Sequence, residues 1–155
     1  TALYNALYVA LREFDAVPSN DGGIRRHAIV LLSDGEDTAS QVGFDDVFDL
    51  ARRSDVSIYA IRIGDPPLPG TKAPRERSAV LRQLAQATGG RVIFIDRAKD
   101  LLPVYGQIAD ELASQYTIAY SPTAAHRDGK WHAIAVKVGR QNYAARTRAG
   151  YLASQ

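Results

Sequence analysis

The sequence predicts an α/β fold in which an open parallel sheet is flanked by helices and followed by a small antiparallel β-meander. Two observations on the first 115 residues favour the parallel sheet. Apolar runs alternate with segments of helical periodicity, as in strand–helix–strand crossovers. The runs are also continuously apolar, as expected of strands covered on both faces. After residue 115 the pattern changes to strict alternation of apolar and polar residues, which is typical of antiparallel strands with one solvent-exposed face.

The first two elements are a helix and a strand. Leu3, Leu7 and Leu11 recur at the spacing of one helix face, and Thr1 is placed to cap that helix. The segment VPSNDGG then breaks the helix, because it combines Pro, Asn, Asp and Gly. The run HAIVLLS at 27–33 follows, and we expect it to be a buried strand.

The next pair has the same order. Residues 42–55 predict a helix with acids near its positive end and Arg52 and Arg53 near its negative end. The run VSIYAIRIG at 56–64 predicts the second strand, and the Pro-rich segment DPPLPGTKAP predicts a surface connection.

The third pair completes the sheet. Residues 77–90 predict a helix that ends at two glycines, and RVIFI at 91–95 predicts the third strand. A last helix follows over 101–115, where Pro103 is tolerated because it falls in the first turn. Its expected buried face comprises Tyr105, Ile108, Ala109 and Leu112.

The C-terminal meander is expected to have three strands. They are YTIAYS at 116–121, WHAIAVKV at 131–138 and the weaker run YAARTRAGY at 143–151. Asp128-Gly129 supplies a tight-turn signal between the first two strands. The expected small core of the meander comprises Ile118, Trp131, Ile134 and Val136.

Composition excludes several classes of protein. The chain has 155 residues, 46% of them hydrophobic and 23% charged, which is the range of one ordinary globular domain. Its net charge of +2 gives little reason to expect nucleic acid as a partner. It has no cysteine, so disulfides and thiolate zinc sites are excluded. No apolar run reaches the roughly 18 residues of a membrane span, so we expect no membrane insertion.

An acidic turn directly follows the first strand. Asp34, Glu36 and Asp37 stand in the segment SDGEDT, at the carboxyl end of a strand, where open parallel sheets bind their ligands. Carboxylates and hydroxyls are hard donors suited to Mg²⁺, Mn²⁺ or Ca²⁺. The structural alternative is a simple turn at Asp34-Gly35, with Asp37 or Thr38 capping the next helix.

The order of several segments resembles the later portion of a von Willebrand factor A (VWA) domain. These segments are TALYNAL, HAIVLLSDGEDT, VSIYAIRIG and LAQATGGRVIFI. The tail from residue 114 is similar to an extension found in bacterial VWA-related proteins, many of them exported. The resemblance implies a Rossmann-like partial VWA fold over residues 1–115 and an antiparallel extension packed on it over 116–155.

The resemblance also implies a metal site and its ligands. VWA domains hold a divalent cation with three loops, and the second and third of these match Thr1 and Asp34. Glu36, Asp37 and Thr38 would form the rim that faces the ligand. The first loop, Asp-x-Ser-x-Ser, does not occur in this sequence, and the family's early strands would precede Thr1. We therefore expect Mg²⁺, Mn²⁺ or Ca²⁺ in the intact domain and no cation bound by this chain alone.

Other candidate sites are weak. His27, His126 and His132 are scattered and have no cysteine to join them in a metal site. No phosphate-binding loop and no nucleophile elbow occurs. The basic residues of the meander predict a solvated face. These residues are Lys130, Lys137, Arg140, Arg146 and Arg148.

The resemblance therefore implies a non-catalytic module for binding or adhesion, which takes a protein ligand through its cation and is exported from a bacterial cell. One alternative is a metal-dependent hydrolase of the phosphatase type that uses the loop at Asp34, which would need a general base or nucleophile beside the metal. Another is a structural fragment with no function of its own. The strand at 27–33 would lie at a sheet edge, so we expect a second copy or an upstream segment to cover it.

Overall fold

The parallel sheet forms as the sequence predicts. The computed structural model describes residues 1–16, 26–64, 72–121 and 128–153. The connection expected at 17–23 and residues 65–71 of the one expected at 65–74 lie outside the described residues. Within the described residues, three parallel strands have the order β1-β2-β3, and two further strands form a separate antiparallel sheet. The elements are α1 (Leu3–Asp15), β1 (His27–Leu32), α2 (Phe44–Arg53), β2 (Val56–Ile63), α3 (Lys72–Thr88), β3 (Val92–Ile95), the 3₁₀ turn η1 (Ala98–Asp100), α4 (Leu101–Ala113), β4 (Trp131–Ala133) and β5 (Gly150–Leu152).

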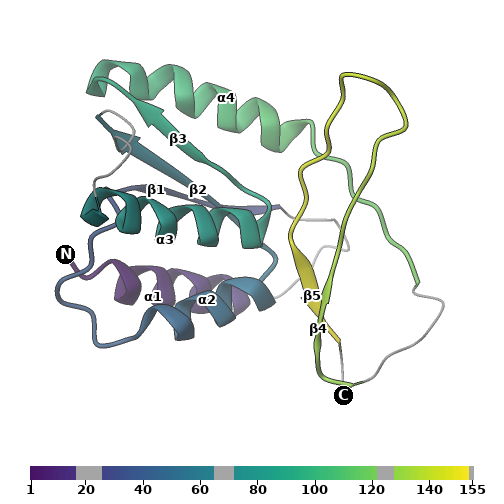
Figure 1. The fold of residues 1–155 in the computed structure, drawn as a ribbon, viewed down its shortest axis with the longest axis horizontal. Helices are drawn as coiled ribbons and strands as arrows, with labels where there is room; N and C mark the ends of the chain where they lie inside the picture. The colour runs from purple at the N-terminus through teal and green to yellow at the C-terminus, as the bar shows by residue number, and fades with distance from the viewer. Residues whose placement is uncertain (17–25, 65–71, 122–127, 154–155) are drawn as a thin grey trace.

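The sheet is the middle of three layers. Figure 1 shows α1, α2 and α3 below the sheet and α4 above it. Alternate residues of β2 face opposite layers, as the strand period of two requires: Ile58 and Ala60 pack with the three helices, whereas Tyr59 and Ile61 pack with α4. Both faces of β2 are therefore buried, which explains its continuously apolar sequence.

The helices bury the stripes that their spacing predicts, except at two positions of α4. Leu3, Leu7 and Leu11 of α1 are buried. In α4 the buried residues are Val104 and Ile108, whereas Tyr105, which is 44% exposed, and Ala109, which is also exposed, do not belong to the buried face. The expectation for Tyr105 was wrong because the helix is rotated by about one residue from the face that the sequence suggested.

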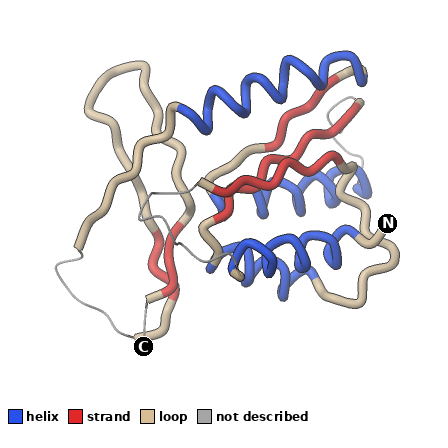
Figure 2. The backbone as a smooth tube through the Cα atoms, turned by 180° about the vertical axis from the view of Figure 1, so that it is seen from behind, coloured by secondary structure: helices blue, strands red, loops and turns tan. Residues whose placement is uncertain are grey.

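The C-terminal extension is antiparallel, but its described residues form two short strands rather than three. β4 pairs with β5, with Trp131 opposite Leu152. The predicted strand at 116–121 and the second half of the one at 131–138 are extended loop, which Figure 2 shows in tan. Ile118 and Val136, which the sequence placed in a small core, are 75% and 42% exposed. Alternation makes a segment compatible with a strand but does not supply a partner for it.

The extension docks on the end of the sheet at which β2 and β3 begin. Arg148 donates hydrogen bonds to the carbonyl oxygens of Arg52 (2.6 Å) and Ser54 (3.2 Å), at the carboxyl end of α2. The guanidinium of Arg52 lies 3.7 Å from the centre of the Trp131 ring. Arg146 donates to the carbonyl of Gly89, just after α3. Arg146 and Arg148 thus hold the extension in place, which corrects the prediction that they belong to a solvated face.

Candidate functional site

The acidic segment lies at the opposite end of the sheet, where β1 ends. Gly35 is buried and has a φ of 85°, a conformation that favours glycine. Its amide donates to the Ser33 hydroxyl, and the amide of Glu36 donates to the Asp34 carboxylate at 3.0 Å. These are side-chain-to-backbone turns of the kind that Ser and Asp make locally. The side chain of Asp34 remains exposed at the tip of this turn.

The next part of the loop is bonded to the start of α1. The amide of Tyr4 donates to Asp37 at 2.9 Å, and the amide of Asn5 donates to the Ser40 hydroxyl at 3.0 Å. In return the Asn5 side chain accepts hydrogen bonds from two amides of the loop, those of Gln41 and Val42. The first amides of a helix have no partner within the helix. The loop therefore accepts hydrogen bonds from the first backbone amides of α1, and the Asn5 side chain of α1 in turn holds the loop in place.

Asp37 is the centre of this network. Partial desolvation acts to raise its pKa, but the hydroxyl of Ser40 and the backbone amides of Tyr4, Ser40 and Ala39 donate to the carboxylate and lower the pKa to about 2. Burial, together with the nearby charge of Asp37, raises the pKa of the Tyr4 hydroxyl. Asp37 is thus a charged structural acceptor, and its oxygens accept hydrogen bonds from the loop and from the first turn of α1.

Two predicted helix caps are placed differently in the structure. Thr1 does not cap α1, because the position before the helix is Ala2 and no side chain caps it locally. Neither Asp37 nor Thr38 caps α2, which begins after Gly43, where the Asp46 carboxylate accepts from the Gly43 amide at 3.3 Å. Asp37 instead caps the first helix, 33 residues earlier in the chain.

The predicted metal ligands lie on this loop and on the segment bonded to it. The terminal ammonium of Thr1 donates to the Thr38 hydroxyl at 2.7 Å, and the amide of Thr38 donates to the Thr1 carbonyl at 2.9 Å. Thr1 is thereby attached to the loop that carries Asp34, Glu36 and Asp37.

This donor set does not fit a complete cation site. In the described part of the chain, no three histidines or acids gather in a way that could hold a metal ion. Thr1 and Asp34 would supply two oxygens, whereas Mg²⁺ or Ca²⁺ needs six or more, only some of them from water.

The described histidines have other contacts. The ring of His27 stacks on Phe14, with the ring centres 4.9 Å apart. His132 contacts Asp128 at 3.1 Å and stacks on Tyr151 in the extension. His126 lies outside the described residues. Neither described histidine is therefore placed beside the acidic loop.

Sequence reasoning missed Asn5 and Ser40, which complete the network between the loop and α1. Asn5 stands in the middle of a helical pattern and Ser40 in a polar segment, and neither position carries a local signal. Only the approach of segments about 35 residues apart gives these two side chains a role.

Comparisons with solved structures give distant likenesses in fold, among them the two that follow. No family model matches this chain, and no curated protein matches it. A crystal structure of conserved hypothetical protein BatB from Bacteroides thetaiotaomicron has a TM-score of 0.49 and 19% identity, over 74% of this chain and 60% of that chain. A crystal structure of an uncharacterized membrane spanning protein from Vibrio fischeri has a TM-score of 0.44 and 22% identity, over 57% of this chain and 48% of that one. Neither likeness is close enough to assign this chain to a family.

None of the described helices is both long enough and apolar enough to cross a bilayer.

Proposed function

We propose that this chain is the C-terminal part of a VWA-like module that binds a protein ligand and has no catalytic activity. One observation carries the proposal. The loop at the carboxyl end of β1 is fixed to α1 through Asp37 and Ser40, and the Asp34 side chain at its tip is exposed to solvent. Ligands of open parallel sheets bind at this end of the strands. A rigid loop with an exposed acid suits recognition, because little entropy is lost when it binds.

The proposal includes a divalent cation in a longer polypeptide. Thr1 and Asp34 would be two of its ligands, and an upstream loop would supply the remaining protein oxygens. Glu36, Asp37 and Thr38 would shape the rim, with Asp37 acting through its hydrogen bonds to α1. An acidic group of the protein ligand would take the open position of the cation. Export from a bacterial cell belongs to the same proposal, and it rests on the resemblance in sequence.

The rival proposal is a phosphatase-like hydrolase that uses the same loop. Such an enzyme needs a nucleophile or a general base within reach of the reacting group. Asp37 is an acid of this loop, and the four hydrogen bonds that it accepts lower its pKa to about 2. A carboxylate of such low pKa is a poor general base near neutral pH. This favours binding over catalysis.

The experiment that separates the two proposals is an assay with p-nitrophenyl phosphate in the presence of Mg²⁺ or Mn²⁺. We expect no release of nitrophenolate above the level of the Asp34→Ala variant. Turnover that depends on the cation and is abolished by Asp34→Ala would favour the hydrolase. The parent and the Asp34→Ala variant should also be compared in a polypeptide that includes the upstream loop. If that polypeptide is inactive too, the missing loop is not the reason for the lack of turnover.

A further inference from the structure

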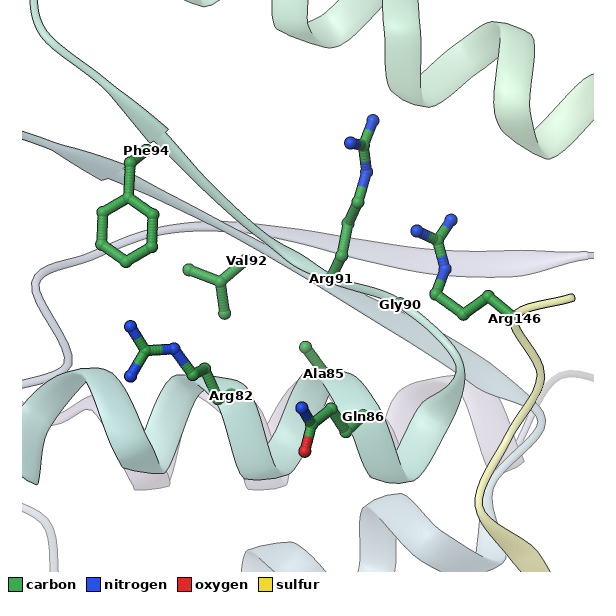
Figure 3. Close-up of a pocket in the computed structure, with 8 residues that line it drawn as sticks. All are labelled: Arg82, Ala85, Gln86, Gly90, Arg91, Val92, Phe94 and Arg146. Atoms are coloured by element: carbon green, nitrogen blue, oxygen red, sulfur yellow. The ribbon is translucent and has the colours of Figure 1, made fainter. Parts of the chain in front are cut away.

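A groove runs along the edge of the sheet that lies farthest from β1. Its volume is about 290 Å³, and its lining comes from the later half of α3, from β3 with the residues before it, and from the extension. Figure 3 shows the side chain of Arg82 on α3 extending toward Phe94 of β3, with Gln86 farther along the same helix. The remaining lining residues are Ala85, Gly90, Arg91 and Arg146.

The backbone of β3 is open on the groove side. In the described part of the chain, β3 pairs only with β2. The carbonyls of Arg91 and Ile95 accept hydrogen bonds from the amides of Ala60 and Gly64 of the β2 segment. Backbone groups of a strand point alternately to its two sides, so those of Val92 and Phe94 point away from β2. An extended peptide can add to such an edge as a further strand.

The charges of the groove select the kind of peptide. The lining contains three arginines and no carboxylate. Arg91 and Arg146 both contact Glu111 of α4, so this acid offsets part of their charge. Arg82 is exposed and lies 5.8 Å from the ring of Phe94, and no described acid forms an ion pair with it. The net charge beside β3 is therefore positive, and Arg82 is its most available donor.

We propose that this groove binds an extended acidic peptide, which pairs its backbone with Val92 and Phe94 and places a carboxylate on Arg82. Side chains of the added strand would alternate between the α3 side and the α4 side of the sheet. Carboxylates are favoured on the α3 side, where Arg82 and Gln86 offer donors and the Phe94 ring flanks the guanidinium. The site needs no cation, and it is separate from the loop at Asp34, which follows the strand at the other edge of the sheet.

The test uses a fluorescein-labelled hexapeptide of alternating Glu and Val, with the Lys-Val hexapeptide as its counterpart, both measured by anisotropy in EDTA. We expect the acidic peptide to bind at least about tenfold more tightly at low salt, and the difference to shrink as salt screens the charges. Arg82→Gln should weaken binding by about tenfold, the size expected for one charge-assisted hydrogen bond. Arg53→Gln, which changes an exposed arginine on α2, and Asp34→Ala should leave the affinity unchanged.

Amide hydrogen exchange supplies a readout of the backbone pairing. Bound acidic peptide should slow exchange at the amides of Val92 and Phe94, and the amides of β1 should keep their rates. Equal affinity of the two peptides, an unaffected Arg82→Gln variant, or protection at β1 instead of β3 would each overturn the proposal. The assay contains EDTA and includes Asp34→Ala, so it does not depend on the cation site. A failure of acidic-peptide binding is therefore distinguishable from a failure of the cation-dependent function.

Discussion

The carboxylate of Asp37 accepts a hydrogen bond of 2.9 Å from the backbone amide of Tyr4, 33 residues earlier in the chain. This bond joins the loop after β1 to the first turn of α1. It does the work of a helix cap, although the capping residue is distant in sequence. The same bond helps to hold the loop that presents Asp34, so the stability of α1 and the shape of the candidate site are coupled.

The first prediction concerns Asp37 and pH. Its pKa is lowered from 3.8 to about 2, so the stability that the charged carboxylate contributes is present above about pH 4 and is lost as the pH falls toward 2. Asp37→Asn should lower the Tm by several degrees near neutral pH and by progressively less between pH 4 and 2. Thermal unfolding across this range measures the difference. Asp45→Asn, at an exposed position in the first turn of α2, is the control; equal effects of the two substitutions would contradict the role of Asp37.

The second prediction concerns the close contact inside the extension. A Cβ atom at Gly150 would lie 2.3 Å from the carbonyl oxygen of His132 and 2.7 Å from the Trp131 ring. Gly150→Ala should therefore separate β5 from β4 and cost about 1–3 kcal/mol, as overpacking does. Gly139→Ala is the matched control, since a Cβ there meets no atom within 4 Å. Urea unfolding of the two variants gives the comparison, and equal midpoints would show that the pairing of β4 with β5 is wrong.

The third prediction uses the chain's single tryptophan. Trp131 lies under the guanidinium of Arg52, so its fluorescence reports whether the extension is docked. Arg148→Gln removes the donors to the carbonyls of Arg52 and Ser54, and it should cost about 1–3 kcal/mol, because these are charge-assisted bonds. The ion pair of Arg148 with the exposed Asp55 should add little.

In the Arg148→Gln variant, Trp131 fluorescence should change at a lower urea concentration than the far-ultraviolet circular dichroism of the helices. Arg140→Gln, at an exposed position of the same extension, should keep the two transitions together. Coincident transitions in both variants would mean that Arg148 does not hold the extension.

The strands and helices were predictable from the sequence because their signals are local. The buried runs that form β1, β2 and β3 and the leucine stripe of α1 depend on neighbouring residues alone. The start of α3 was harder to predict from the sequence. It begins at Lys72, five residues before the predicted range, because a proline in the first turn was interpreted as part of the preceding connection.

Contacts between distant segments were not predictable. The sequence suggested three strands after residue 115, yet alternation cannot say which segment will lie beside it, and 116–121 has no strand assignment. The roles of Asp37 and Arg148 could not be predicted for the same reason, since their partners lie 33 and more than 90 residues away. The location of Asp34 at the end of β1 was predictable, because it depends only on the strand before it.

The fourth prediction concerns the edge strand β1. In the described part of the chain it pairs with β2 alone; its residues from His27 to Leu31 are half-buried, and Leu32 is 49% exposed. An apolar edge without charges or prolines favours pairing with another strand. We propose that copies of the isolated chain associate through β1. Size-exclusion chromatography with light scattering should show a mass above 16.9 kDa that grows with concentration.

Leu32→Lys places a charge on this edge without opening the core, and it should shift the protein toward the monomer. Leu152→Lys, at an exposed position of β5, is the control and should leave the association unchanged. A parent chain that remains monomeric at high concentration would contradict the proposal.

The central claim is that the cation site of the proposed module is divided between this chain and a segment upstream of Thr1. Isothermal titration calorimetry with Mg²⁺ and Mn²⁺ tests it most directly, on this chain and on a polypeptide that includes the upstream loop, each with and without Asp34→Ala. We predict one cation bound by the longer polypeptide, at least about tenfold weaker binding after Asp34→Ala, and no measurable binding by the 155-residue chain. Tight binding by the short chain alone, or binding by the longer one that Asp34→Ala leaves unchanged, would contradict the claim.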